Sequence, residues 1–159
     1  AMLFILVGVI YDRAHHRVIE GFGGIAKQMP VYAGITLFAF MAGLGLPGLS
    51  GFISEFMCFV GAFGTSPFFR TVVIISTFGI VINAAYFLSA YKKIFFGELN
   101  QKYSSLPDIN GRELFTLIPL ALITLFLGVY PGPFLDMIKE TMTVLIDQVV
   151  LIGSFAHLP

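Results

Sequence analysis

Two long stretches of the chain carry no charged side chain: residues 71–91 and residues 114–135. A helix needs about 20 mainly apolar residues to cross the ~30 Å hydrocarbon core of a bilayer. Within hydrocarbon, a helix also satisfies all of its own backbone hydrogen bonds. The pattern therefore predicts one membrane-spanning helix over residues 68–95 and another over residues 112–131.

A third apolar stretch, residues 28–69, contains a single charge, Glu55. It is either a hairpin of two short helices that turns at Pro47-Gly48 or one span that is broken there. Basic residues concentrate on one side of a membrane. The hairpin divides the Lys and Arg residues five against four, whereas the broken span divides them seven against two. We therefore predict one discontinuous helix over residues 31–65.

The predicted break is centred on Leu46, Pro47 and Gly48, in a segment that is rich in glycine. Proline removes a backbone donor, and glycine tolerates the irregular dihedrals that follow. At membrane depth, non-helical backbone is tolerated where it is buried in protein or lines a wet cavity. A simple proline kink is the alternative interpretation.

The two ends of the chain differ from its centre. Residues 1–12 begin with ten apolar residues, too few to span a bilayer, and we interpret them as the end of a span and the chain as the C-terminal part of a longer protein. Residues 134–156 carry four charges and an apolar stripe at helical spacing, which predicts an amphipathic helix lying at the interface. The stripe comprises Ile138, Met142, Leu145, Val149 and Ile152.

The composition agrees with a membrane protein: 57% of the residues are hydrophobic and 11% are charged, against about 25% charged in soluble domains. The formal net charge is zero, so no basic field favours nucleic acid. A single cysteine excludes an internal disulfide and a thiolate cluster. We expect an all-α fold, a polytopic transmembrane helix bundle that forms part of a single domain over residues 1–159.

Glu55 is the strongest candidate functional residue. It lies eight positions after Pro47, among phenylalanines, with no basic residue within ten positions. An ionised carboxylate at the centre of a bilayer costs at least ~2.5 kcal/mol, so such groups face a bundle interior, pair with a cation or hold a proton. We therefore predict that Glu55 relays protons. A permanent ion pair that only stabilises assembly is the alternative.

The other candidates are weaker. Asn83 is the one strongly polar residue within 71–91, where interhelical packing explains it better than a proton path. His15 and His16 fall in a polar loop near Arg17 and are best explained as solvated loop residues, with no metal site. The chain has no nucleotide-binding or metal-binding motif such as GxGxxG, HExxH or CxxC.

The segment GLPGLSGFISEF, residues 45–56, closely resembles the signature of the antiporter-like membrane subunits of respiratory complex I (NADH-quinone oxidoreductase). YDRAHHR, residues 11–17, resembles the segment that precedes it in that family. Arg112-Glu113-Leu114 and Tyr130-Pro131 resemble subunit M (chain 4) rather than its paralogues L and N.

This resemblance implies a helix broken at residues 46–48 and a C-terminal helix on the outer face against neighbouring subunits. It implies that Glu55 is the ionisable residue of a proton half-channel, near the exit to the positive side. Earlier helices would supply lysine partners. Arg17 and His15 match family positions and are supporting candidates, together with Asn83.

The implied function is proton translocation coupled to quinone reduction, as a subunit of an enzyme. NADH, FMN, iron–sulfur clusters and quinone would be bound by other subunits, with no cofactor in this chain. The expected partners are other membrane subunits of complex I and the lipid bilayer, in a bacterial cytoplasmic or an organellar inner membrane. A cation/proton antiporter subunit, a membrane-bound hydrogenase subunit and a purely structural subunit are the alternatives.

Overall fold

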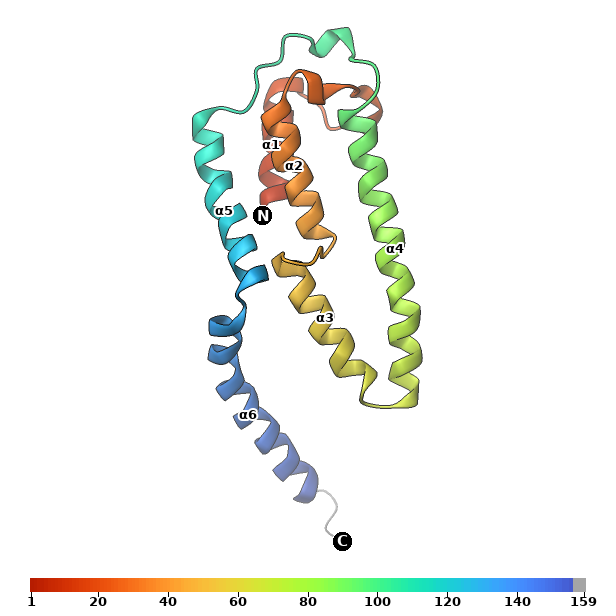
Figure 1. Ribbon diagram of the computed structural model, residues 1–159, viewed down its shortest axis with the longest axis vertical. Helices are drawn as coiled ribbons and strands as arrows, with labels where there is room; N and C mark the ends of the chain where they lie inside the picture. The colour runs from red at the N-terminus through yellow and green to blue at the C-terminus, as the bar shows by residue number, and fades with distance from the viewer. Residues whose placement is uncertain (156–159) are drawn as a thin grey trace.

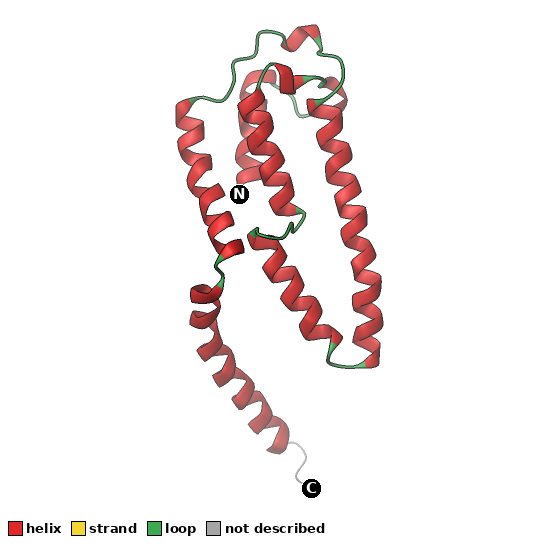
Figure 2. Ribbon diagram, in the orientation of Figure 1, coloured by secondary structure: helices red, strands yellow, loops and turns green. Residues whose placement is uncertain are grey.

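The computed structural model describes residues 1–155, with side chains for residues 1–149. Helices and loops account for all of the described residues, and no strand occurs among them (Figure 2). The expectation of an all-helical fold is therefore confirmed for this part of the chain. In order, the elements are α1 (Met2–Ala14), η1 (Ile19–Gly21), η2 (Ile25–Lys27), α2 (Pro30–Gly43), α3 (Ser50–Phe63), α4 (Pro67–Phe95), η3 (Gln101–Tyr103), α5 (Gly111–Val129) and α6 (Gly132–Phe155).

Four helices share one end of the molecule. α1 and α4 finish there and α2 and α5 start there, so that the connections 15–29 and 96–110 form a single loop layer (Figure 1). Hydrogen bonds join the connections. The Gly24 N–H donates to the carbonyl of Phe96 (3.2 Å), and the Asn100 amide donates to the carbonyl of Gly21 (3.0 Å).

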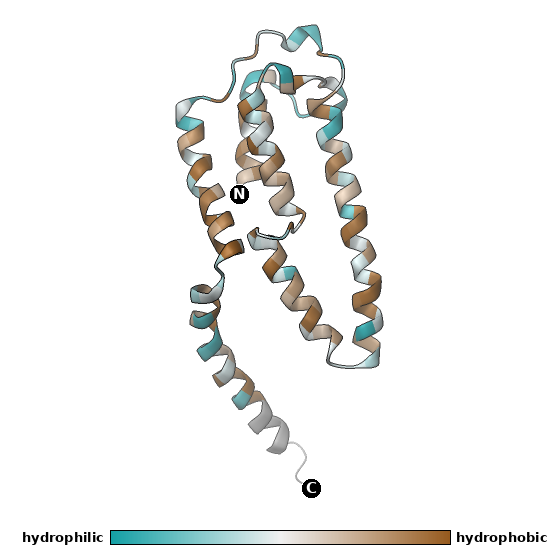
Figure 3. Ribbon diagram, viewed as in Figure 1, coloured by the Kyte–Doolittle hydropathy of each residue, from teal (hydrophilic) through white to brown (hydrophobic). Residues whose placement is uncertain are grey.

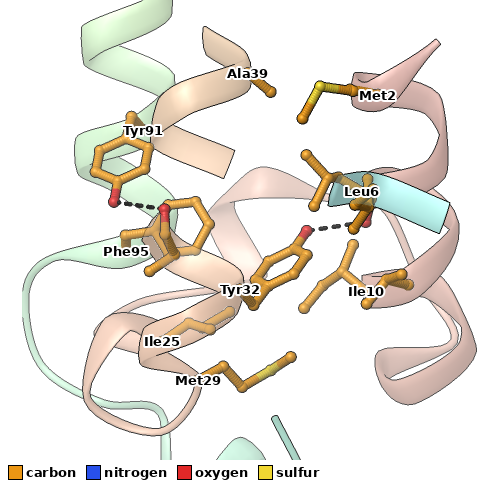
Figure 4. Packing of buried hydrophobic residues seen from close by; sticks show 12 residues of the cluster. Met2, Leu6, Ile10, Ile25, Met29, Tyr32, Ala39, Tyr91 and Phe95 are labelled. Atoms are coloured by element: carbon orange, nitrogen blue, oxygen red, sulfur yellow. Dashed lines mark hydrogen bonds between the residues drawn. The ribbon is translucent and has the colours of Figure 1, made fainter. Parts of the chain in front are cut away.

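Below the loop layer, α1, α2 and α4 enclose an apolar core (Figure 4). Its tyrosine hydroxyls are paired with backbone carbonyls. Tyr32 donates to Leu6 of α1 (2.9 Å) and Tyr91 donates to Ala33 of α2 (3.1 Å). Since a buried hydroxyl without a partner is costly, these bonds favour one arrangement of the three helices.

α4 and α5 are long and apolar enough to cross a membrane, judged by length and composition. Their apolar side chains are mostly not covered by the rest of the chain: Phe78 and Ile82 of α4 are 68% and 70% exposed, and Phe115 of α5 is 78% exposed. Brown, apolar ribbon dominates both helices in Figure 3. An exposed apolar surface of this extent is typical of helices that face lipid or further protein.

The remaining helices extend away from the core. α3 leads away from the end of α2 instead of doubling back beside it, and α6 extends beyond the end of α5 (Figure 1). Polar and apolar residues alternate along α6 in Figure 3. Ala156, the last residue of the amphipathic helix expected over 134–156, lies outside the described residues, as does the side chain of Ile152.

Candidate functional site: the helix break and Glu55

Six residues, 44–49, separate α2 from α3 and are called the helix break below. Gly45 and Gly48 have φ angles of +68° and +92°, in the region that side chains other than glycine's rarely adopt. Between them Pro47 has no N–H to donate. The φ angles therefore favour glycine at positions 45 and 48, and residues 46–48, where the break was predicted, lie within this connection.

Glu55 lies in the second turn of α3, and its side chain reaches back to the helix break. A Cβ atom added to Gly45 would lie 2.6 Å from Oε2 of Glu55 and 3.0 Å from its carboxyl carbon. The carboxylate thus lies directly against the backbone of Gly45, where a side chain at position 45 would displace it. This contact places the acidic group between the C-terminal end of α2 and the N-terminal end of α3.

The ends of the two helices are close together as well. A Cβ on Gly51, in the first turn of α3, would lie 2.6 Å from the carbonyl oxygen of Ala42 in the last turn of α2. Helix ends leave backbone donors and acceptors without helical partners. No side chain caps the first turn of α3 at Leu49. The carboxylate of Glu55 therefore lies beside peptide groups that can bind water.

Aromatic residues lie near Glu55 along α3. Phe52 and Phe56 on the same helix stack on each other with ring centroids 5.5 Å apart. Glu55 is half-buried. Within residues 1–149, no side chain forms a hydrogen bond or an ion pair with its carboxylate. The described part of the chain also holds no group of His, Cys, Asp and Glu that could bind a metal ion.

The supporting candidates lie away from the helix break. His15 ends α1 with a φ of 57°, and Arg17 places its guanidinium 4.7 Å from the centroid of the Tyr11 ring. Both are exposed in the loop layer. α2, with 14 residues and a length of about 21 Å, separates that layer from the helix break. The structure thus does not bring His15 or Arg17 to Glu55.

Arg17 also borders a cavity of about 290 Å³ between α1, α2 and α4. Apart from Arg17, Tyr32, Thr36 and Tyr86, apolar side chains line it. The hydroxyls of Tyr32 and Thr36 already donate to the carbonyls of Leu6 and Tyr32. These two hydroxyls therefore have no hydrogen left to donate to a polar ligand.

Asn83, the remaining candidate, is half-buried near the middle of α4. Among the described side chains, none forms a hydrogen bond with its amide. The structure therefore shows no hydrogen bond between Asn83 and Glu55.

Sequence reasoning missed an ion pair that joins α1 to α5. Arg13 donates from Nη1 to Oε1 of Glu113 (3.0 Å) and from Nη2 to Oε2 (2.8 Å). The Arg13 guanidinium also donates to the carbonyls of Val9, Pro107 and Asp108. Glu113 lies three positions after the N-cap Asn110 and forms a capping box with it, a local signal that is visible in the sequence. The pairing with Arg13, which lies 100 positions earlier, leaves no such signal in the sequence.

Two further contacts hold the loop layer together. Asp108 accepts hydrogen bonds from the N–H groups of Val31 (3.0 Å) and Tyr32 (3.1 Å), so it caps α2 from the connection 96–110. His16 forms a hydrogen bond with the hydroxyl of Tyr103 and stacks on Phe22. His16 therefore links the two connections of the loop layer, whereas its neighbour His15 is exposed to solvent.

Comparison with known proteins identifies relatives over most of the chain. It is 41% identical over 147 residues to the NADH-quinone oxidoreductase subunit M of Rhodobacter capsulatus, covering 92% of this chain and 28% of that protein. It is 36% identical over 153 residues to the F(420)H(2) dehydrogenase subunit M of Methanosarcina mazei, covering 96% of this chain and 30% of that protein. The chain thus spans less than a third of the length of these relatives.

A solved structure and a family model agree with these matches. The fold resembles a chain of respiratory complex I from Thermus thermophilus with bound NADH, with a TM-score of 0.73 and 36% identity over 83% of this chain and 27% of that one. Residues 1–83, which include the helix break and Glu55, match the model of the family described as NADH:quinone oxidoreductase/Mrp antiporter, TM. The resemblance that the sequence suggested is confirmed, and the chain belongs to this family.

Proposed function

We propose that this chain is the part of a subunit M-type protein that translocates protons across a membrane, coupled to the reduction of quinone by NADH, with Glu55 as a proton relay. The observation that carries the proposal is the position of the Glu55 carboxylate, against Gly45 in the helix break. The relatives named as NADH-quinone oxidoreductase subunit M support the coupling to this enzyme.

In this proposal, α2 and α3 form one discontinuous span, and α4 and α5 form the next two. The direction of α3, which leads away from α2 in Figure 1, favours a single broken span over a hairpin. α6, with charged and apolar residues interspersed along it, would lie at the interface against neighbouring subunits. Positive charge on the loop layer favours its orientation toward the cytoplasm or its equivalent. The cations at that end are Arg13, Arg17, Lys27, Lys92, Lys93, Lys102 and Arg112.

Proton transfer through Glu55 requires water that exchanges a proton with the carboxyl group and nearby charges that change its proton affinity. A cation that approaches a carboxyl group favours its ionised form, and an anion that approaches it favours the protonated form. A change of charge elsewhere along the membrane arm would therefore load or release the proton. The backbone groups freed at the helix break can hold the water through which that proton enters or leaves.

The electron-transfer groups belong to other subunits in this proposal: NADH, FMN, iron–sulfur clusters and quinone. This chain would contribute to the enzyme as a proton-translocating subunit, embedded in the lipid bilayer beside other membrane subunits of complex I. Arg17, His15 and Asn83 remain predictions as supporting residues of the proton path.

The test replaces Glu55 with glutamine in the full-length subunit of the assembled complex. We expect Glu55→Gln to reduce proton pumping and quinone-linked NADH oxidation roughly tenfold or more, while Glu55→Asp keeps a substantial part of both. Glu98→Gln is the matched control, because Glu98 is exposed in the loop layer. Near-normal pumping by Glu55→Gln would refute the proposal.

The description of the family, which includes Mrp antiporters, favours a second candidate, an ion-driven cation/proton antiporter subunit. The two candidates differ in their energy source. Proton transport that requires NADH and quinone supports the first candidate. Cation/proton exchange by the full-length protein in vesicles without either reagent supports the second.

A further inference from the structure

The end of α5 contacts the helix break at a glycine. Gly128 is buried, and a Cβ atom there would overlap the carbonyl oxygen of Gly48 and the backbone of Leu49. Leu49 itself is only 7% exposed. The backbone of α5 therefore packs directly on the backbone of the helix break, at a distance that only glycine permits.

This close approach is not shared by every helical glycine of the chain. Gly61 in α3 and Gly79 in α4 are also helical glycines, and a Cβ on either would meet no atom within 4 Å. The two provide a contrast within the same chain, since alanine is sterically acceptable at 61 and 79 but not at 128. A helical glycine also costs about 0.5–1 kcal/mol relative to alanine, a cost that the packing at Gly128 offsets.

Backbone hydrogen bonds within α2 and the helix break, such as Leu46 N–H to the carbonyl of Met41 (3.2 Å) and Leu49 N–H to the carbonyl of Leu46 (3.0 Å), shape the segment locally but do not tie it to α5. The first turn of α3 has no side-chain cap at Leu49, and Pro47 has no N–H with which to donate a hydrogen bond. Earlier in the helix break, Gly45 is in contact with the Glu55 carboxylate. Gly128 and Glu55 thus touch the same short segment, Gly128 at residues 48 and 49 and Glu55 at residue 45.

We infer that Gly128 is a positioning residue for the proton relay: by packing on Gly48 and Leu49, it sets the position of the helix break and so of the Glu55 carboxylate relative to the end of α2. The inference rests on the proposed function of Glu55. It adds that a residue on α5, beyond the segment matched by the family model at residues 1–83, controls the geometry of the relay.

The test introduces Gly128→Ala into the full-length subunit and purifies the assembled complex. A displacement of about 1 Å can cost a reaction up to roughly a hundredfold, so we expect quinone-linked turnover and proton pumping to fall at least several-fold. We also expect the pH optimum of turnover to move by about half a unit or more, because the surroundings of a proton-carrying group have changed. NADH oxidation by ferricyanide should stay normal.

Gly79→Ala is the matched control and should leave both the rate and the pH optimum unchanged. If the complex with Gly128→Ala does not assemble, Leu49→Ala is tested instead. Gly128→Ala adds volume at the contact between residues 128 and 49, and Leu49→Ala removes volume there. Leu49→Ala should move the pH optimum with a smaller loss of rate. A variant that assembles with the rate and the pH optimum of Gly79→Ala overturns the inference, as does a lower rate with an unmoved pH optimum.

Glu55→Gln, measured alongside, separates this inference from the proposed function. Near-normal pumping by Glu55→Gln would mean that the proposed function fails. Lost pumping by Glu55→Gln together with unaltered behaviour of Gly128→Ala would mean that only the positioning role fails.

Discussion

Arg13 and Glu113 form a bidentate ion pair, with N–O distances of 3.0 and 2.8 Å, that joins the last turn of α1 to the first turn of α5. The side chain of Arg13 is 8% exposed and that of Glu113 is 22% exposed. Three backbone carbonyls accept further hydrogen bonds from the same guanidinium. The ion pair thus holds the first turn of α5. The last turn of the same helix contacts the helix break through Gly128.

Arg13→Lys should destabilise the subunit by about 2–3 kcal/mol, because an ammonium group cannot reproduce the bidentate geometry and leaves Glu113 partly unpaired. The measurement is the temperature at which the purified complex loses this subunit. Arg112→Lys, at an exposed neighbouring arginine, should change that temperature little. Equal effects of the two variants would contradict a structural role for the pair.

Gly45→Ala should impair proton pumping as well as stability. The φ of +68° at Gly45 costs a side-chain-bearing residue about 1–2 kcal/mol, and the new Cβ would displace the Glu55 carboxylate. We expect fewer protons pumped per NADH oxidised, measured in reconstituted vesicles. Gly61→Ala, also near Glu55 in the sequence but with no atom within 4 Å of its Cβ, should pump normally.

Asp108→Ala should destabilise the start of α2 by about 1 kcal/mol, the usual cost of losing an N-terminal cap. Amide hydrogen exchange of Val31 and Tyr32 should become faster, because Asp108 accepts from both N–H groups. Asp108→Asn keeps one carbonyl oxygen and should have an intermediate effect. Unaltered exchange in Asp108→Ala, compared with Asp12→Ala at an exposed position, would argue against capping.

Tyr103→Phe should loosen the loop layer while keeping the ring in place. The variant removes the hydroxyl that pairs with His16, at a cost of about 1 kcal/mol. Limited proteolysis should then cut the connections 15–29 and 96–110 more readily than in the unaltered protein. Tyr130→Phe, at a tyrosine that is 59% exposed, serves as the control, and equal proteolysis of the two variants would refute the tether.

Charge spacing and residue type were informative wherever the determining interaction is local. The uncharged stretch 71–91 falls within α4, and the uncharged stretch 114–135 covers most of α5. The glycines and proline of residues 45–48 correspond to the helix break, because their dihedral preferences act within one or two residues. The isolation of Glu55 among apolar residues was also visible in the sequence, since it depends only on neighbours along the chain.

Contacts between segments that are distant along the chain could not be predicted from the sequence. His15, Arg17 and Asn83 were selected by residue type and by family resemblance, and their role stays a prediction, since among the described side chains none of the three forms a hydrogen bond or ion pair with Glu55. Arg13 and His16 make the interactions that hold the loop layer together. Their partners lie 100 and 87 positions away, a separation that leaves no periodic or spacing signal.

The sequence by itself therefore determined an all-helical, lipid-compatible chain with an interruption beside an isolated acidic residue, because hydrophobicity and backbone preference are properties of single residues and short segments. Only the tertiary structure decided that the carboxylate of Glu55 returns to Gly45 and that α5 packs on the helix break through Gly128. Such contacts depend on how helices pack in three dimensions, where a single Cβ atom is enough to forbid them.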